Sequence, residues 1–186
     1  MPGAQLRSEV YLLLASLLRE APSGELLEQL KDRQQGWNIG LDEMERPLVE
    51  LSQAAAESQL EALIHEYHRL FIGVTQGRLL PYESWYRVGS LHDRPLVELR
   101  DELVVLGIER TPGLGEPEDH IAAICEVMAL LIEDHDPRQE EFFNRHLASW
   151  MSRFCGDLQK ETTARYYRAV GTVLHKWGNL EQGLLD

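Results

Sequence analysis

Three polar side chains between residues 61 and 68 have the types and spacing of a metal site. Glu61, His65 and His68 stand at positions i, i+4 and i+7, so a helix would project two imidazoles and one carboxylate from one face. Such a set suits a divalent metal ion. The same residue types commonly occupy the solvated flank of an amphipathic helix. The spacing leaves a metal-dependent enzyme open as an alternative, but it favours an ordinary exposed helix face.

A second combination, Ser84 with Asp119 and His120, holds the residue types of a hydrolytic triad. Ser84 is not part of a G-x-S-x-G nucleophile elbow. Asp119 directly precedes His120, and adjacent side chains on a helix point about 100° apart. The geometry therefore argues against a triad. His120 is still unusual, because an imidazole can donate or accept a hydrogen bond and can titrate near neutral pH.

A third group of residues could bind a peptide. Tyr82, Trp85 and Tyr86 offer broad and rigid apolar contact area. Carboxylates elsewhere could accept paired hydrogen bonds from arginine, and the candidates are Glu83, Glu116, Glu118, Asp119 and Glu126. A ligand that is both apolar and arginine-bearing would suit such a surface. The spacing alone equally allows the aromatic residues to belong to the core.

The aromatic residues lie in an apolar connection between two helical segments, residues 70–86, with the sequence LFIGVTQGRLLPYESWY. Gly73 and Gly77 give this connection backbone freedom, and Pro81 blocks helix formation just before the aromatic cluster. A polar connection would be ordinary. One with this much apolar surface is expected either to tuck into the core or to receive a ligand.

The segments before this connection are predicted to be helices. Apolar residues with a period of 3.6 predict an opening helix that ends near Arg19, and Ser23 can cap a short second helix. Pro47 is expected in the first turn of a third helix. A capping box that starts at Ser58 marks the beginning of a fourth helix, which Gly73 would end in a left-handed conformation.

Further helices are predicted after the connection. Asp93 is expected to cap a helix that ends at Gly107. The next helix is predicted to open with E-P-E-D at residues 116–119, whose acids would lie at the positive end of the helix dipole. Asp136 is expected to start another helix, and a break within residues 154–157 separates it from a last amphipathic helix.

No segment shows sustained period-two alternation or an internal repeat. We therefore predict a single all-α domain over residues 1–186, a bundle of about eight to ten helices. Its 186 residues can bury a core without a disulfide or a structural metal. Cys125 and Cys155 lack any zinc-binding pattern, so we expect them to be buried thiols in a reducing cytoplasm.

The charge balance and the apolar runs limit the function classes. The net charge is −13, from 31 acidic and 18 basic residues, which argues against nucleic acid and leaves a basic partner open. No apolar run approaches the roughly 20 residues of a membrane-spanning helix. The opening apolar run has no cleavage pattern and is expected to be a core helix, so we predict a cytoplasmic protein. Glycine-rich phosphate loops are absent from the sequence.

Several motifs taken together resemble a known family. They are Y-x-x-L-F-x-G at residues 67–73, P-Y-E-S-x-Y at 81–86, E-P-E-D-H-I at 116–121, F-F-x-x-H-L-x-x-W at 142–150 and R-F-C-x-D-L at 153–158. This set resembles the redox enzyme maturation proteins related to TorD and DmsD, which are cytoplasmic chaperones of molybdenum oxidoreductases. Related chaperones of respiratory nitrate reductase share the fold but have different motifs, so the TorD and DmsD branch is favoured.

The resemblance implies an all-helical chaperone with no cofactor of its own, and no enzyme. Such a protein would bind the twin-arginine signal peptide of an apo molybdoenzyme catalytic subunit, or the body of that subunit. It would delay export until the molybdopterin guanine dinucleotide cofactor is inserted, so the cofactor-insertion machinery is a further possible partner. An adaptor that recognises only the folded body of a metalloenzyme stays an alternative. The family is also associated with helix-exchanged dimers, and both a monomer and such a dimer stay open.

The resemblance also places the family's binding region on two of the motifs. Carried over residue by residue, this region comprises Tyr82, Glu83, Ser84, Trp85, Tyr86, Glu116, Pro117, Asp119 and His120. We expect Asp119 and Glu83 to engage guanidinium groups of the signal peptide. Trp85 and Tyr82 are expected to line the apolar part of the site.

Overall fold

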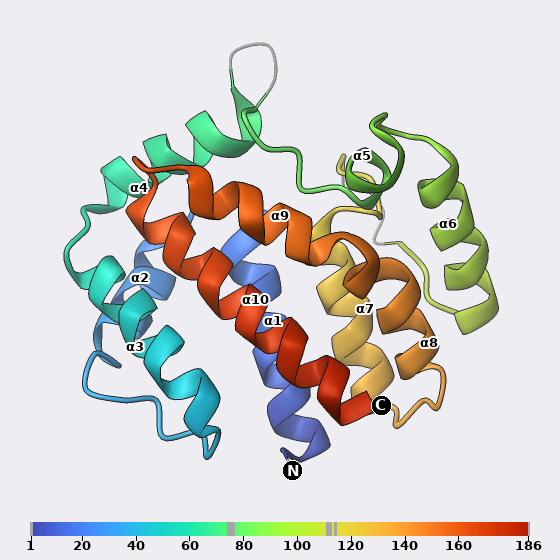
Figure 1. Ribbon diagram of the computed structural model, residues 1–186, viewed down its shortest axis with the longest axis horizontal. Coiled ribbons are helices and arrows are strands. Elements are labelled where there is room, and N and C mark those ends of the chain that lie inside the picture. The colour runs from blue at the N-terminus through green and yellow to red at the C-terminus, as the bar shows by residue number, and fades with distance from the viewer. Residues whose placement is uncertain (1, 74–76, 111–112, 114, 186) are drawn as a thin grey trace.

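The computed structural model describes residues 2–73, 77–110, 113 and 115–185. Within these ranges the chain forms ten α-helices and two π-helical turns (Figure 1). The elements in the first half are α1 (Ala4–Arg19), α2 (Gly24–Lys31), α3 (Asp42–Ala56), α4 (Leu60–Tyr67), the π-helical turn η1 (His68–Ile72) and α5 (Glu83–Val88). Those in the second half are α6 (Arg94–Leu106), α7 (Ile121–Glu133), α8 (Gln139–Phe143), the π-helical turn η2 (Asn144–Ala148), α9 (Ser149–Lys160) and α10 (Arg165–Leu185). The predicted all-α fold is confirmed.

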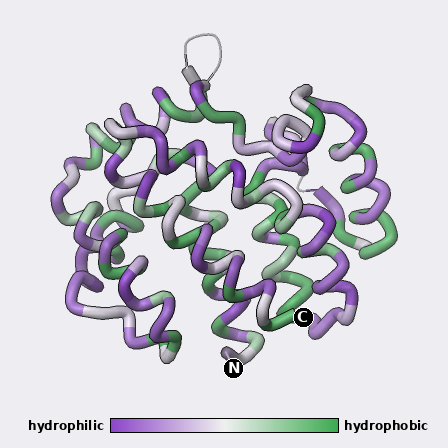
Figure 2. The backbone as a smooth tube through the Cα atoms, in the orientation of Figure 1, coloured by the Kyte–Doolittle hydropathy of each residue, from purple (hydrophilic) through white to green (hydrophobic). Residues whose placement is uncertain are grey.

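Helix α7 lies at the centre of the molecule because nearly all of its residues are apolar. Its sequence is IAAICEVMALLIE, and most of its side chains are buried. Helix α1 packs along it, and Figure 2 shows α7 as hydrophobic over most of its length. Cys125 in α7 and Cys155 in α9 are buried free thiols, as predicted. Burial raises the pKa of Cys155 to about 12, so this side chain stays an uncharged thiol.

Helix α10 crosses the front of the bundle in Figure 1 and packs against α3 and α9. Tyr167, Val170, Leu174 and Trp177 are buried on one face of this helix, as their spacing predicts. Tyr11 of α1 meets Trp177 edge to face, with ring centroids 5.6 Å apart. The last helix thereby closes the core over α1.

Several helix ends agree with their capping residues. The side chain of Ser23 accepts a hydrogen bond from the Leu26 N–H at the start of α2. Asp93 caps α6, and Gly107 ends that helix with φ 74°. Gly73 ends the turn η1 with φ 64°. These predicted boundaries are therefore confirmed.

Two predicted features of α3 and α4 are wrong. Pro47 lies inside α3, because that helix already begins at Asp42. The capping box predicted from Ser58 does not form, since Gln59 is the N-cap of α4 and makes no capping bond through its side chain. The Ser58 hydroxyl instead donates to the Ala54 carbonyl at 2.7 Å, and so it belongs to the end of α3.

Three boundaries in the second half also differ from the prediction. Helix α7 begins at Ile121, so the acids of residues 116–119 precede it and are not in its first turn. Helix α8 begins at Gln139, three residues after the expected start at Asp136. No break occurs within residues 154–157, because α9 continues through Gly156 to Lys160. The buried stripe of α9 outweighs the low helix propensity of that glycine.

The apolar connection of residues 70–86 is shorter than predicted. The turn η1 extends to Ile72, and α5 already begins at Glu83. Leu79 and Leu80 are buried, and the Leu79 N–H donates to the Leu70 carbonyl at 2.8 Å. Both described ends of this segment therefore contribute residues to the core, and Trp85 and Tyr86 lie on α5.

Over the described ranges, no helix combines the length and the apolarity that crossing a membrane requires.

Candidate functional site

The P-Y-E-S-x-Y and E-P-E-D-H motifs lie side by side. Tyr82 and His120 form an isolated antiparallel β-bridge. The Ile121 N–H donates to the Pro81 carbonyl at 2.9 Å, and the Glu83 N–H donates to the Asp119 carbonyl at 2.9 Å. Two segments that are far apart in sequence thus form one structural unit, which joins the start of α5 to the start of α7.

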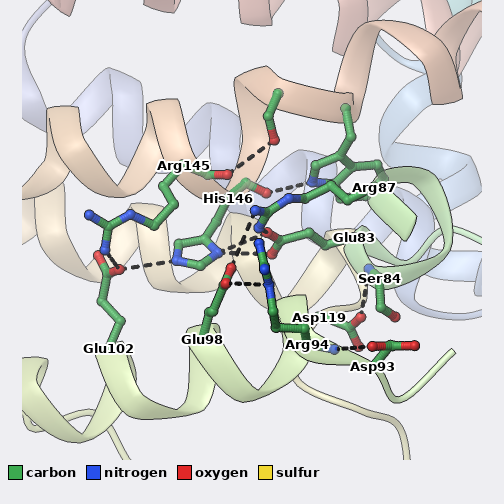
Figure 3. Close-up of polar contacts among 12 residues, drawn as sticks. Glu83, Ser84, Arg87, Asp93, Arg94, Glu98, Glu102, Asp119, Arg145 and His146 are labelled. Carbon is green, nitrogen blue, oxygen red and sulfur yellow. Dashed lines mark hydrogen bonds and ion pairs between the residues drawn. The ribbon is translucent and has the colours of Figure 1, made fainter. Parts of the chain in front are cut away.

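Asp119 caps helix α5 from a distant part of the chain. Tyr82, the N-cap residue of α5, makes no capping bond through its own side chain. The Ser84 N–H instead donates to Asp119 Oδ2 at 3.0 Å (Figure 3). A carboxylate at this place satisfies backbone N–H groups that have no partner within the helix. Asp119 is itself almost completely buried.

Two polar atoms of this junction have no hydrogen-bond partner among the described residues. They are Asp119 Oδ1 and the Ser84 hydroxyl oxygen, and both are buried. Ser84 and Asp119 are therefore in contact through the Ser84 backbone and not through its hydroxyl. This arrangement lacks the hydroxyl-to-imidazole contact of a hydrolytic triad, in agreement with the sequence argument.

His120 is a neutral capping residue. Its Nδ1 accepts a hydrogen bond from the Ala122 N–H at 3.2 Å, which caps α7. Burial lowers the pKa of His120 to about 4, and the nearby carboxylate of Glu116 only partly opposes this effect. The ring of Tyr82 stands edge to face against the imidazole, with centroids 5.1 Å apart.

Glu116 and Pro117 complete the turn before α7. The Tyr82 hydroxyl donates to Glu116 Oε1 at 2.6 Å. Burial and this carboxylate together raise the pKa of Tyr82 well above its usual value. The Pro117 carbonyl accepts a hydrogen bond from the His120 N–H at 3.2 Å. Glu116 is thus engaged by the same tyrosine that the sequence places in the apolar part of the site.

Trp85 is the aromatic residue of α5 that is most open to solvent. Its side chain is 38% exposed, and Val88, one turn later on the same face, is 50% exposed. Tyr86 points the other way, because its ring stacks on Trp150 at 5.6 Å and its hydroxyl donates to Asp157 at 3.3 Å. The outer face of α5 therefore offers apolar contact area, while its inner face belongs to the core.

Glu83 is fully buried and already has an arginine and a histidine as partners. Its carboxylate accepts from the guanidinium of Arg87 and lies 2.9 Å from Nδ1 of His146 (Figure 3). Nε2 of His146 lies 3.1 Å from Glu102. His146 is the histidine of the F-F-x-x-H-L-x-x-W motif, and its neighbours in the sequence do not indicate its contacts with Glu83 and Glu102. This motif is the feature of the sequence that points to His146.

Arginines extend this network over the surface of α5 and α6. Arg87 also donates to Glu98 at 3.2 Å, and Arg94 pairs with the same carboxylate at 2.9 Å. Arg145 pairs with Glu102 at 2.6 Å. The network therefore ties α5 and α6 to the turn η2 by charge-assisted hydrogen bonds.

A groove of about 160 Å³ lies beside the E-P-E-D-H motif, between α6 and α7. Leu103, Ile108 and Leu130 contribute apolar side chains to it, and Glu109 and Glu116 contribute carboxylates. The groove joins apolar surface to acidic groups at the edge of the predicted binding region. Arg19 and Arg110 also line the groove, so its polar lining carries both signs of charge.

The other acids near this groove are paired within the chain. Glu118 pairs with Arg100 at 2.8 Å, and Glu126 pairs with Arg19 at 2.6 Å. Burial acts to raise the pKa of Glu118, but Arg100 outweighs this effect and holds it below its usual value. A partner's arginine would have to compete with these internal pairs.

The metal set that the sequence leaves open as an alternative is not supported by the structure. Glu61, His65 and His68 all lie exposed on α4 and η1. In the part of the chain that is described, no group of three His, Cys, Asp or Glu side chains could hold a metal ion. The exposed-flank interpretation of these three residues is the one that the structure supports.

Comparisons with known proteins agree on one family. The family model of the nitrate reductase delta subunit matches residues 40–156, more than half of the chain. A chaperone protein TorD of Shewanella pealeana is 26% identical over 194 residues, covering 95% of this chain and 88% of the relative. The Haemophilus influenzae protein named as the Tat proofreading chaperone DmsD is 29% identical over 161 residues, covering 82% and 74%.

A solved structure has the same fold. It is a protein of Archaeoglobus fulgidus assigned to redox enzyme maturation, with a TM-score of 0.61 and 21% sequence identity. The alignment covers 91% of this chain and 93% of that one. The resemblance to TorD and DmsD that the motifs indicate is thereby confirmed.

Proposed function

The chain belongs to the nitrate reductase delta subunit family, the family of the TorD chaperones, and from this premise we propose that it is a maturation chaperone for a molybdenum-containing oxidoreductase. It acts in the cytoplasm, before the client is exported, and it catalyses no reaction of its own. Its ligand is the twin-arginine signal peptide of the apo catalytic subunit, the body of that subunit, or both. Release follows cofactor insertion.

The observation that carries this proposal is the bridge between Tyr82 and His120. It brings the two motifs that the resemblance assigns to client binding into one structural unit. The exposed face of Trp85 and Val88 on α5 and the groove beside Glu116 both adjoin this unit. Apolar area next to carboxylates matches a signal peptide, in which two arginines precede an apolar run.

The charge of the whole chain favours the same ligand. At a net charge of −13, the protein attracts a cationic peptide over some distance at low ionic strength. This attraction raises the association rate more than the final affinity. Arginine selectivity therefore has to come from particular carboxylates.

The two carboxylates expected to engage guanidinium, Asp119 and Glu83, are buried in this conformation. Asp119 caps α5, and Glu83 accepts from Arg87. In our proposal they reach the signal peptide only when α5 moves. Trp85 and the acids of the groove make the first contact.

The burial of these two carboxylates favours one alternative. An adaptor that recognises the folded body of a metalloenzyme would need only the outer surface around Trp85 and Val88. It would not need access to Asp119 or Glu83. Such an adaptor would bind a client whose leader has been removed.

Calorimetric titration with a synthetic twin-arginine signal peptide tests the proposal, with a twin-lysine peptide as control. We expect binding of the arginine peptide only, because a guanidinium makes paired hydrogen bonds that an ammonium cannot. Trp85→Ala should weaken this binding. Leu12→Ala, which removes an equally exposed apolar side chain on α1, should not. Binding of a leaderless client with no binding of either peptide would favour the adaptor.

A further inference from the structure

His146 lies buried between two carboxylates that come from different helices. Its Nδ1 is 2.9 Å and 3.1 Å from the two oxygens of Glu83, and its Nε2 is 3.1 Å from Glu102. The His146 and Glu83 side chains are both fully buried. A neutral imidazole has one N–H, so one contact would set a nitrogen lone pair against a carboxylate. Only the imidazolium donates to both partners.

Each of these carboxylates also accepts a hydrogen bond from an arginine. Arg87 donates to Glu83, and Arg145 donates to Glu102. An ionised carboxylate only accepts hydrogen bonds, so neither glutamate supplies the missing proton to the ring. The second ring proton therefore belongs to His146.

The charges of the network balance only with a cationic histidine. The acids are Glu83, Glu98, Glu102 and Glu141, and the bases are Arg87, Arg94, Arg145 and His146. A neutral ring would leave the buried Glu83 with Arg87 as its one cationic partner among the described residues. A buried carboxylate that loses part of its compensation is destabilised.

Among the described residues, the side chains that bind the ring nitrogens come from α5 and α6 alone. The indole of Trp150 in α9 donates to the His146 carbonyl at 2.6 Å, which fixes the backbone of the turn. Helices α7 and α10 also touch η2, but within the described ranges neither contributes a hydrogen bond or ion pair to the ring. The charged groups that face His146 are thus Glu83 from α5 and Glu102 from α6. Arg87, Glu98, Arg138, Arg145 and Glu141 lie behind them, and the Phe142 ring of α8 packs on the imidazole with centroids 5.0 Å apart.

The network is placed where α5 and α6 attach to the bundle. Helix α6 packs mainly on α5, and Figure 1 shows the two at one end of the molecule. A groove of about 160 Å³ separates α6 from α7, and another of about 420 Å³ lies between α6 and α8. Pro95, Leu96, Leu99 and Leu103 bury one face of α6, and the charged contacts to η2 hold its other side.

We propose that His146 is a positioning residue whose imidazolium holds α5 and α6 in the closed position, and that loss of one ring proton loosens these helices and opens the site to an arginine-bearing peptide. Only the identity of the peptide rests on the proposed function. The clamp itself is a property of the fold. It predicts that access to Glu83 increases as the pH rises.

Nitrogen NMR of the histidine rings and hydrogen exchange test the clamp in the full chain. In the wild-type protein, both ring nitrogens of His146 should carry protons at low pH. Between about pH 5 and about pH 8, the range in which histidines change charge, protection of residues 83–106 should fall while residues 165–185 keep theirs. The exchange rates are corrected for their intrinsic pH dependence.

Variants separate the clamp from general loss of structure. His146→Gln should remove the pH dependence of exchange in residues 83–106, because glutamine does not titrate in this range. If His146→Gln does not fold, Glu102→Gln takes its place in this test, because Glu102 is a partner of the ring that is less buried. His65→Gln, at an exposed position of α4, should keep the wild-type profile. A singly protonated His146 at every pH, or a wild-type pH profile in His146→Gln, would overturn the proposal.

Peptide titration at the two pH values links the clamp to binding. The arginine peptide should bind more tightly at the higher pH, on the order of tenfold, because apparent affinity follows the fraction of open molecules. Equal affinity at both pH values would overturn the link and leave the proposed function intact. A pH-dependent exchange with no peptide binding at any pH would overturn the proposed function and leave the clamp intact.

Discussion

The carboxylate of Asp119 caps helix α5, where its Oδ2 accepts the N–H of Ser84, 35 residues earlier in the chain, at 3.0 Å. The Asp119 carbonyl takes the neighbouring N–H of Glu83 at 2.9 Å. Helix α5 has no capping side chain of its own, so its start depends on Asp119. The acid that the family resemblance assigns to guanidinium binding therefore also has a structural role, and the two roles can be separated.

Asp119→Asn removes the charge and keeps an oxygen that can accept from Ser84. Asp119→Ala removes both, and we expect it to lower the free energy of unfolding by about 1 to 2 kcal/mol, the cost of a lost helix cap. The Asn variant should lose less stability. If Asp119 engages guanidinium, both variants weaken binding of the arginine peptide. Urea unfolding and calorimetry measure the two effects, and an Asn variant with wild-type affinity would show that Asp119 acts only as a cap.

Truncation of Trp85 should mainly weaken peptide binding, whereas truncation of Trp150 should mainly lower stability. Trp85 is partly exposed on α5, so Trp85→Ala should cost less than about 1 kcal/mol of stability and should weaken peptide binding. Trp150 is fully buried against Tyr86 and Phe154, so Trp150→Ala should cost about 3 to 5 kcal/mol. Thermal unfolding and titration of both variants check this contrast. A Trp85→Ala protein that unfolds like the Trp150 variant would place Trp85 in the core.

Helices whose limits are set by neighbouring residues were predictable from the sequence. Ser23 and Asp93 cap the helices that follow them, and Gly107 ends α6, because each of these contacts is local. The buried face of α10 followed from its apolar period in the same way. Short-range chemistry decides these features, and it is visible in a single sequence.

Features that depend on distant contacts were missed or misplaced. The acids of residues 116–119 look like a first helical turn, yet α7 starts later because the Asp119 backbone and side chain are used by α5. His146 meets Glu83 and Glu102 only through the tertiary fold, and no local spacing indicates these pairs. The proximity of the two motifs was indicated by the family resemblance and not by periodicity.

Alanine substitutions at Gly77 and Gly156 should change the stability of the protein in opposite directions. A Cβ atom on Gly77 would overlap the backbone carbonyl of Phe71, so Gly77→Ala should destabilise the protein by about 1 to 3 kcal/mol. Gly156 lies within α9 with open space around it, and Gly156→Ala should stabilise by about 0.5 to 1 kcal/mol. Denaturant unfolding of both variants measures whether each substitution lowers or raises the free energy of unfolding. A neutral Gly77→Ala would mean that the chain after η1 can move away from Phe71.

His120 should make the folded protein less stable as the pH falls. Burial lowers its pKa in the folded state from 6.5 to about 4, so between these values the unfolded chain binds a proton that the folded chain does not. Stability therefore decreases from about pH 6.5 downward, by up to about 3 kcal/mol at about pH 4. This sign is opposite to that of the His146 clamp, which weakens as the pH rises.

His120→Asn isolates this contribution, because asparagine is a good N-cap for α7 and does not titrate. Carboxylates that lose their charge in acid affect both proteins alike, so the difference between wild type and variant reports His120. We expect the variant to have the shallower dependence of unfolding free energy on pH between about pH 6.5 and about pH 4. Parallel pH curves for the two proteins would contradict a neutral, buried His120. The expected result is a shallower curve for His120→Asn with unchanged exchange in residues 83–106. It would assign the loss of stability in acid to His120 at the start of α7, and the loss of protection at high pH to the clamp on α5 and α6.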